Sequence, residues 1–443
     1  MHETDRDALP AVEDNRSRGD TEGRHRRRRE HGMRMPVIAR SSVAAAVLAL
    51  PVSWPVPAAA AGPPPAGAPA AAPGTSPLDC PGTRSVPGGY RLTRDTECSV
   101  EWREDDAVLD LAGHTLTGRI TPYGNRQTVR NGSLVLEPEY WANAVGLTLS
   151  GLRITRTPTG SSSFYVEMGS DSLVEDCVVS GMPGAALSYY FGRGGTVRDS
   201  VFLDNGRGIS VQAGGGIRIE SNSFRRNTVG VNLWNERGSL IDVTIRGNVL
   251  RDNSFSGVRM VLRGDGGAPY RFRDVHVQEN RFVGNGAAGL YAQSRCVGQD
   301  SAACADAGGT QIRRNLFLGN GHSPPEGSDD GTDDGLTARG VRNDTVPEPQ
   351  ALAEILVAGN TALRNADLGL DADGVLDGGG NRARDNGDPA QCTGVVCGSG
   401  SPGTPAAGTG TPVPGGPGTA GRAGTAGQVR AGPPQDGTDQ YRH

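Results

Sequence analysis

The sequence predicts an all-β fold, a single-stranded right-handed parallel β-helix in which the chain winds into a solenoid of stacked coils. Three observations lead to this prediction: a repeat of about 21 to 45 residues, asparagine at two fixed places in the repeat, and a composition of 67 Gly with only 35% hydrophobic residues. Such a composition provides too little apolar material for several compact cores, so one thin, elongated core is expected.

The repeat places an aliphatic residue, a small polar residue, a large apolar residue, a second asparagine and a Gly-aliphatic pair at constant spacing. The segment Ile219–Asn227, with Phe224 between its two asparagines, is typical. The first column runs through Cys177, Ser200, Asn222, Asn248, Asn280, Asn315, Asn360 and Asn381, and the second through Asn205, Asn227, Asn253, Asn285, Asn320, Asn365 and Asn386. Coils that stack about 4.8 Å apart bring identical side chains together, so these amides are expected to hydrogen-bond along the stack.

Parallel strands joined by short turns without a crossover helix require a solenoid, and its hand is expected to be right. Stretches that favour helix are nearly absent, no six-residue period indicates a left-handed β-helix, and the leucines that leucine-rich repeats need are missing. The glycine in pairs such as Gly208-Ile209 is expected to allow a tight corner into the next strand. About ten or eleven coils follow, capped by the segments 80–106 and 388–397.

The ends of the chain differ in composition from the repeats. Arginines, the apolar run Val43–Leu50 and small residues up to Ala61 are typical of an export signal, with translation expected to start at Met33 or Met35. A basic arm that stays attached is the alternative. The predicted organisation is a signal or targeting segment at 1–61, a Pro/Ala-rich linker at 62–79, the β-helix with disulfide-bearing caps at 80–397 and a disordered Gly/Pro/Thr-rich tail at 398–443.

The seven cysteines fall into three local pairs and one single residue, Cys177. The pairs predict disulfides that join Cys80 with Cys98, Cys296 with Cys304, and Cys392 with Cys397. No CxxC pair or Cys/His cluster has the spacing of a zinc site. The pattern indicates an oxidising compartment and, with the export signal, predicts a secreted, extracellular protein.

The charge pattern excludes several classes of function. The formal net charge is -5, and the 44 basic residues are all arginine, so lysine nucleophiles and Schiff-base chemistry are excluded. No overall positive charge attracts nucleic acid or an anionic membrane, and the apolar run near the N-terminus is too short to span a bilayer. We expect no nucleic-acid partner, no membrane span and a monomer.

Strand alternation predicts that residues two and four positions beyond each corner glycine face outward. The longer coils between Asn248 and Asn360 indicate that this wall forms the functional face. Its candidate carbohydrate-binding residues are Tyr190, Gln212, Asn232, Trp234, Arg259, Arg263, Tyr291 and Arg295. Aromatic rings stack on sugar faces, and arginine binds the carboxylates of uronates. The alternative is an ordinary solvated wall.

The acidic insertion Ser328–Gly335 precedes a strand beside the coil that carries Asp371 and Asp373, and calcium is the one cofactor that it suggests. Calcium needs six to eight oxygen ligands, which adjacent coils could supply. The candidate ligands are Asp330, Asp333, Asp334, Asp371 and Asp373. The alternative is a solvated Gly/Asp insertion, because the spacing matches neither an EF-hand nor a nonapeptide calcium motif.

The segment Leu109–Gly118, the Asn-x-Phe-x-x-Asn lines and the Gly-aliphatic strands resemble the pectin-lyase-like proteins, a group with parallel β-helix repeats named for carbohydrate binding and sugar hydrolysis. The resemblance covers roughly residues 92–390 and implies the fold more specifically than the reaction. Pectate lyases of this fold use an arginine base, which makes Arg259, Arg263 and Arg295 the conceivable bases here. The polygalacturonase elements are not found as a set, and the Asp-Pro-His element of alginate epimerases is absent.

These observations favour a secreted β-helix protein that binds acidic polysaccharide, with lyase-like or hydrolytic cleavage as a further hypothesis. Catalytic residues stay unassigned, because no complete catalytic set is found; Glu236, for example, has no identifiable carboxylate partner on a neighbouring coil. The alternative is a non-catalytic structural or cell-surface protein that presents its loops to a protein partner.

Overall fold

The computed structural model describes residues 80–137, 141–142, 144–158, 166–235, 238–264, 271–296, 306–324, 333–340 and 352–399. In these ranges the regular elements are β-strands, numbered up to β36, and none is an α-helix. The predicted signal segment and linker lie outside the described ranges, as does the predicted tail beyond residue 399. Over the same ranges, no helix is long and apolar enough to cross a membrane.

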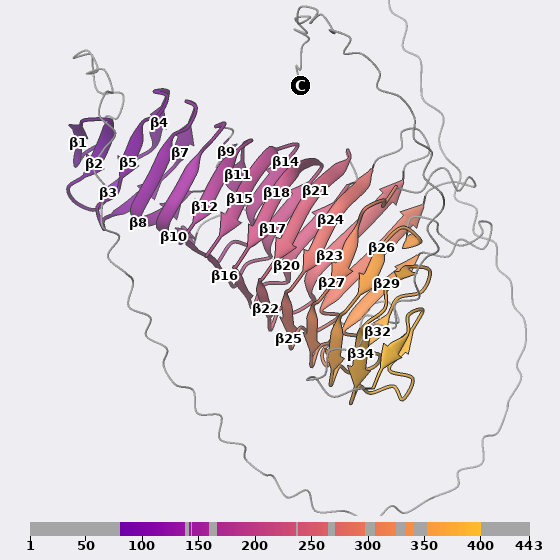
Figure 1. Ribbon diagram of the computed structural model, residues 1–443. Helices are drawn as coiled ribbons and strands as arrows, with labels where there is room; N and C mark the ends of the chain where they lie inside the picture. The colour runs from indigo at the N-terminus through magenta and orange to yellow at the C-terminus, as the bar shows by residue number, and fades with distance from the viewer. Residues whose placement is uncertain are drawn as a thin grey trace, which may run out of the picture. The chain divides into compact units, whose positions relative to one another are not determined.

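Three rows of strands form the walls of a right-handed parallel β-helix (Figure 1). The first row consists of β2 (Gly89–Leu92), β5 (Val108–Asp110), β8 (Thr128–Leu136), β10 (Thr148–Arg156), β12 (Ser172–Glu175), β15 (Arg193–Arg198), β18 (Gly214–Glu220), β21 (Leu240–Arg246), β24 (Phe272–Gln278), β27 (Gln311–Arg313), β30 (Leu356–Ala358) and β33 (Leu376–Asp377). β1 (Thr83–Val86) pairs with β2 in an antiparallel hairpin and covers the N-terminal edge, within the segment predicted as a cap.

The second row continues the same sheet after a bend. It consists of β3 (Thr96–Glu97), β6 (Thr115–Gly118), the second halves of β8 and β10, β13 (Val178–Ser180), β16 (Val201–Leu203), β19 (Ser223–Arg225), β22 (Val249–Arg251), β25 (Arg281–Val283), β28 (Leu316–Leu318), β31 (Thr361–Leu363), β34 (Asn381–Arg384) and β36 (Cys397–Gly398). Apart from the β1–β2 hairpin, the strand pairs of the described residues are parallel, for example β16 with β19 and β19 with β22.

The third row forms two sheets that are separate from the sheet of the first two rows. A two-stranded sheet of β4 (Val100–Trp102) and β7 (Ile120–Pro122) comes first. The ten-stranded sheet that follows contains β9 (Trp141–Ala142), β11 (Val166–Met168), β14 (Ala185–Tyr190), β17 (Arg207–Gln212), β20 (Val229–Trp234), β23 (Ser256–Gly264), β26 (Leu290–Cys296), β29 (Leu336–Gly340), β32 (Leu370–Asp371) and β35 (Cys392–Thr393). We call this ten-stranded sheet the third wall. Its strand count is close to the ten or eleven coils expected.

The core is a stack of like side chains along the solenoid. The rings of Phe202 and Phe224 lie 4.9 Å apart at 11°, and those of Phe282 and Phe317 lie 4.8 Å apart at 9°. All four phenylalanines are fully buried, and each contributes about 1.5–3 kcal/mol by leaving water. The core is therefore continuous from coil to coil, as the composition predicted.

The two asparagine columns form hydrogen-bonded ladders, which confirms the predicted register. Asn248 Nδ2 donates to Asn280 Oδ1 at 3.0 Å and to the Ile219 carbonyl at 2.8 Å, while the Asn248 backbone N–H donates to the same Oδ1 at 2.9 Å. The second ladder repeats this pattern from Asn205 to Asn386, where Gln391 Oε1 accepts the last amide bond at 2.8 Å. Each buried amide is thus satisfied within the protein, which offsets its cost of desolvation.

The corner before the third wall requires glycine for a different reason from the one expected. Gly208 does not have a positive φ, so no tight left-handed corner requires it. A Cβ there would lie 2.6 Å from the Gly230 carbonyl oxygen of the next coil and 2.6 Å from Phe224 Cδ1. Close stacking, and not backbone freedom, therefore requires glycine at this position.

Two of the predicted disulfides form, joining Cys80 with Cys98 and Cys392 with Cys397. Cys296 ends β26, but its predicted partner Cys304 lies outside the described residues. Cys177 is a free, buried thiol in the first ladder column, and burial raises its pKa to about 12. A thiol with so little thiolate character is unreactive, so Cys177 is structural.

Candidate functional site

The third wall presents two columns of outward side chains, because parallel strands in register stack equivalent residues. The first column contains Ser188, Ser210, Asn232, Arg259, Tyr291, Thr337 and Asp371, and the second contains Tyr190, Gln212, Trp234, Val261 and Gln293. The residues between them, such as Val211 and Leu233, are fully buried in the core. The structure therefore brings the predicted wall residues together on consecutive coils.

The first column is more covered than a solvated wall would be. Asn232 is 0% exposed, Tyr291 7% and Asp371 2%, although all three point away from the core. Asn232 Nδ2 donates to Ser210 Oγ at 3.4 Å, and Asn232 Oδ1 accepts from Arg259 Nη1 at 3.5 Å. Of the predicted candidates in this column, Arg259 is the one that is half-buried and not covered.

The ring of Tyr291 makes an edge contact with Phe255, with centroids 5.8 Å apart. Asn232 and Tyr291 therefore contact neighbouring residues of the wall, and their contact with sugar stays a prediction. Arg263 and Arg295 face each other in register on β23 and β26, but their side chains lie outside the described part of the structure.

The second column is accessible where β14, β17 and β20 end. Tyr190, Gln212 and Trp234 occupy successive coils and are each half-buried. Phe191, directly after β14, is 51% exposed, and its ring centroid lies 4.5 Å from that of Tyr190 at 73°. We call Tyr190, Phe191, Gln212 and Trp234 the aromatic strip. The Trp234 Nε1 group is shielded from solvent and has no acceptor among the described atoms.

Phe191 combines two unfavourable features that call for an explanation. Its φ is 56°, in the left-handed region that is unusual for a bulky side chain, and half of its apolar surface meets solvent. Ala213, at the same place one coil later, has a φ of 61° but is buried. Backbone strain and an exposed ring at one position point to function. Sequence alternation missed Phe191, because it follows the last residue of its strand.

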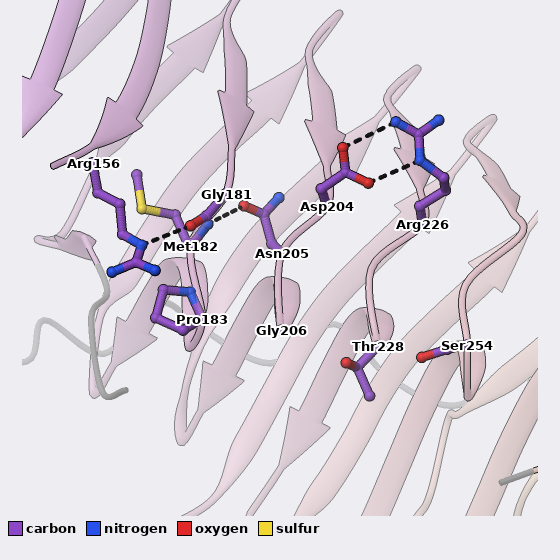
Figure 2. A pocket seen from close by; sticks show the side chains of 10 residues that line it. All are labelled: Arg156, Gly181, Met182, Pro183, Asp204, Asn205, Gly206, Arg226, Thr228 and Ser254. Atoms are coloured by element: carbon purple, nitrogen blue, oxygen red, sulfur yellow. Dashed lines mark hydrogen bonds and ion pairs between the residues drawn. The ribbon is translucent and has the colours of Figure 1, made fainter. Parts of the chain in front are cut away.

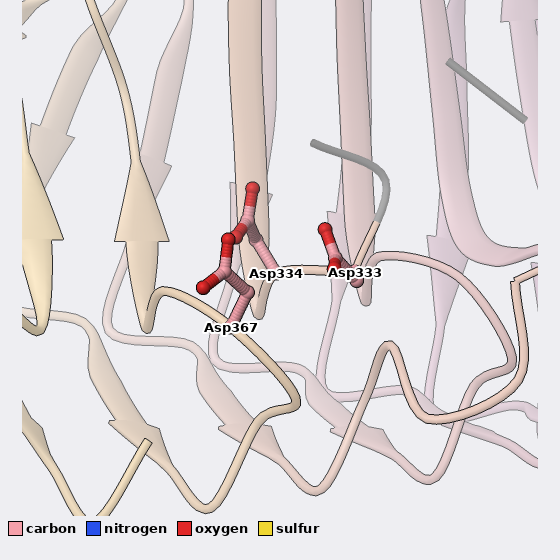
Figure 3. A group of neighbouring side chains, drawn as sticks. All are labelled: Asp333, Asp334 and Asp367. Atoms are coloured by element: carbon pink, nitrogen blue, oxygen red, sulfur yellow. The ribbon is translucent and has the colours of Figure 1, made fainter. Parts of the chain in front are cut away.

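A carboxylate cluster lies where the chain enters β29 and β32 (Figure 3). The carboxylate oxygens of Asp333, Asp334 and Asp367 lie within 4.8 Å of one another. Asp334 is fully buried; its Oδ1 accepts the Leu368 N–H at 3.0 Å and its Oδ2 accepts the Thr337 hydroxyl at 3.1 Å. Burial, and then the nearby charge of Asp371, raise the pKa of Asp334 to about 7.

This cluster differs in membership from the predicted calcium ligands. Asp333 and Asp334 belong to it, Asp371 acts on Asp334 by its charge, Asp373 is exposed, and Asp330 lies outside the described residues. Asp367 was missed because it precedes a corner glycine, where only stacking of the coils brings it close. Three carboxylates are fewer than the six to eight oxygens that calcium prefers, and both oxygens of Asp334 already accept hydrogen bonds. Calcium binding here stays a prediction.

Comparison with known proteins agrees with the fold. Residues 140–317 match the family model described as the right handed beta helix region. The fold and this match define the chain as a right-handed parallel β-helix protein, which confirms the predicted resemblance at the level of the repeat. A search of curated proteins found no match.

Solved structures with a similar fold are distant in sequence. A mannuronan C-5 epimerase A-module of Azotobacter vinelandii is 18% identical, with 71% of this chain and 90% of that chain covered and a TM-score of 0.45. The Dettilon tailspike protein is 13% identical, with 69% and 60% covered and a TM-score of 0.48. The catalytic unit of a GH87 alpha-1,3-glucanase from Streptomyces thermodiastaticus is 13% identical, with 68% and 63% covered and a TM-score of 0.40.

Proposed function

We propose that this protein binds polysaccharide outside the cytoplasm and that the aromatic strip is its contact with sugar rings. The observation that carries the proposal is the succession of Tyr190, Phe191, Gln212 and Trp234 over three consecutive coils. Aromatic rings stack on the CH-rich faces of sugars, and amide N–H groups donate to sugar hydroxyls. At about 4.8 Å per coil the strip extends about 10 Å along the solenoid axis.

The surface supports a glycan better than a protein partner. A stable protein interface covers about 800 Å² on each side and centres on a contiguous apolar patch. Among the described residues, the large hydrophobic side chains with high exposure are Tyr123, Val145, Phe191, Leu376 and Val396, which belong to coils scattered along the solenoid. A narrow strip with polar neighbours suits an extended sugar chain instead.

Arginine near the strip favours an acidic glycan. Arg259 extends from β23, the strand next to β20, and is half-buried. A guanidinium group binds a carboxylate through two parallel hydrogen bonds, which a neutral sugar cannot provide. The two disulfides support an oxidising location, in line with the proposed export.

Titration of the purified chain with acidic and neutral oligosaccharides tests the proposal. Trp234→Ala and Phe191→Ala are expected to lower the affinity about tenfold each, the usual contribution of one stacked ring. Tyr123→Ala is the matched control, because Tyr123 is 50% exposed but lies on β7's coil, outside the strip. Equal affinities for the parent and both strip variants would remove the proposal.

A second candidate function is cleavage of the bound glycan by the carboxylate cluster. Asp334 and Asp367 come from neighbouring coils and approach within 4.8 Å, nearer to the separation in retaining than in inverting glycosidases. With a pKa of about 7, Asp334 would hold a proton near neutral pH. Asp334 is 0% exposed, so donation of this proton to a glycosidic oxygen requires that the bound glycan open the corner around it. Incubation with pectins, alginates and glycosaminoglycans, followed by reducing-sugar release and ultraviolet absorbance, tests hydrolysis and lyase cleavage. Activity that Asp334→Asn abolishes is the expected result; no product from any substrate rejects cleavage and leaves binding.

A further inference from the structure

An open groove of about 460 Å³ lies on the corner that precedes the third wall (Figure 2). Its lining comes from the turns just before β14, β17, β20 and β23 and from the end of β10. The aromatic strip lies at the other end of these third-wall strands. We call this feature the corner groove; it is separate from the strip and from the carboxylate cluster.

Arg156 enters the corner groove without a compensating acid. Its Nε donates to the Gly181 carbonyl at 2.9 Å, and no carboxylate of the described residues pairs with it. Its Nη1 is shielded from solvent and has no hydrogen-bond acceptor among the described atoms. A guanidinium group that has lost water contacts without gaining an acceptor raises the free energy of the unliganded protein.

The other guanidinium group in the groove, that of Arg226, differs from Arg156 because it is paired with a carboxylate. Arg226 makes a two-bond ion pair with Asp204, at 2.8 Å from Nε to Oδ1 and 2.9 Å from Nη2 to Oδ2 (Figure 2). Its charge is therefore compensated within the protein. Arg156, Asp204 and Arg226 together leave one net positive charge in the groove, and that charge belongs to Arg156.

The remaining lining suits a sugar chain. Pro183 is exposed and gives an apolar surface next to Arg156, and the exposed residues Thr228 and Ser254 add hydroxyls further along. The lining residues come from five successive coils, so the groove runs along the stack for about 19 Å. An extended chain can lie in it with an anionic group at the Arg156 end and hydroxyls near Thr228 and Ser254.

We propose that the corner groove is a second glycan-binding site, in which Arg156 pairs with a carboxylate or sulfate group of an acidic polysaccharide. The inference rests on the proposed function for the class of ligand, but on different residues for the site. The corner groove lies at the start of the third-wall strands and the aromatic strip at their end. The protein could therefore bind one polysaccharide chain in the groove and another on the strip. The anion pairs with the guanidinium group of Arg156, and the exposed Pro183 faces the sugar ring.

Calorimetric titration of the full chain tests this with three oligosaccharides: a uronate oligomer, the same oligomer with its carboxyl groups reduced, and a sulfated oligomer. Arg156→Gln is expected to lower the affinity for an anionic oligomer at least tenfold and to leave that for the reduced oligomer unchanged. Whether the uronate or the sulfated oligomer shows this loss identifies the source of the anion. Arg198→Gln is the matched control, since Arg198 is exposed and its Nη2 is ion-paired with Glu175 at 2.6 Å.

A second variant tests the groove without changing its charge. Thr228→Trp fills the groove from an exposed position, so it should block the same binding while the melting temperature stays that of the parent. Wild-type affinity in both Arg156→Gln and Thr228→Trp, or an equal loss in Arg198→Gln, overturns the groove. If only Trp234→Ala lowers the affinity for the oligomers, the groove proposal is overturned and the strip is supported. If only Arg156→Gln and Thr228→Trp lower it, the groove is supported and the strip is overturned. A parent chain that binds none of the three oligomers contradicts both.

Discussion

Asn248 and Asn280 are 32 residues apart in the chain, yet the side-chain amide of the first donates a 3.0 Å hydrogen bond to the side-chain oxygen of the second. The same oxygen accepts the backbone N–H of Asn248 at 2.9 Å, so one side chain satisfies two buried donors of the preceding coil. Coil stacking thus depends on polar side chains as well as on the apolar core, because each coil ends a strand at a buried bend.

Removal of one ladder amide should destabilise the solenoid strongly. Asn280→Ala leaves two donors of Asn248 without an acceptor and frees the Ile245 carbonyl, which Asn280 Nδ2 contacts at 2.8 Å. We expect a loss of about 3 kcal/mol in the free energy of unfolding, measured by urea denaturation. Asn125→Ala, at an exposed residue, should cost less than about 1 kcal/mol. Equal losses in the two variants would mean that the ladder is not a stabilising element.

Close stacking at the corner glycine predicts a cost for a single methyl group. Gly208→Ala places a Cβ 2.6 Å from a backbone oxygen of the next coil, which cannot move without shifting that coil. We expect about 2 kcal/mol or more of destabilisation by thermal denaturation. Gly181→Asn is the contrast: Gly181 has a φ of +76°, a Cβ added there would meet nothing within 4 Å, and asparagine tolerates that backbone, so its cost should stay below about 1 kcal/mol. A tolerated Gly208→Ala would refute the stacking explanation.

The buried carboxyl of Asp334 predicts a specific pH dependence of stability. Its pKa is about 7 in the folded protein and near 4 in the unfolded chain, so between these values the folded state binds more protons. The free energy of unfolding should therefore fall by up to about 4 kcal/mol as the pH rises from 4 to 7, and level off above 7. Asp334→Asn keeps an oxygen that accepts the Leu368 N–H, and its amide group can donate to the Thr337 hydroxyl oxygen. This variant should abolish the slope and be more stable than the parent at pH 8. Denaturation curves at pH 4, 6 and 8 measure the effect; parallel curves for parent and variant would disprove it.

Strain at Phe191 predicts that a substitution there changes the affinity for oligosaccharide but hardly changes the free energy of unfolding. Phe191→Gly removes a left-handed side chain that costs about 1–2 kcal/mol and loses the contact with Tyr190, so the free energy of unfolding should stay within about 1 kcal/mol of the parent. Affinity for oligosaccharide should nevertheless fall about tenfold. Ala213→Gly is the matched control, because it relaxes the same backbone position without removing a ring. A Phe191→Gly variant that unfolds easily but binds normally would assign Phe191 a purely structural role.

Particular residues show how far sequence reasoning reached. Asn222, Asn248 and Asn280 were placed in one column by spacing alone, and their hydrogen bonds follow from that register. Outward alternation also placed Tyr190, Gln212 and Trp234 on one face. Periodicity decides both results, because a strand has a period of two and a solenoid repeats its coil.

The sequence repeat did not predict which outward-facing side chains are buried. Asn232 and Tyr291 point outward like Gln212 by strand alternation, yet they are covered, and alternation alone does not predict which outward residues are covered. Asp367 joins Asp334 only through the stacking of two coils, across an insertion whose length breaks the repeat. Arg156 likewise has no motif; the corner groove that surrounds it is made by turns from five coils.

The sequence by itself determined the solenoid, its register and the two ladders, since these depend on residue types that recur at fixed spacing and meet their own copies. Only the tertiary structure decided which outward residues stay accessible, which carboxylates converge and that Arg156 has no carboxylate partner among the described residues. Those properties depend on contacts between coils at irregular positions, where distance, desolvation and charge act between residues that no local pattern connects.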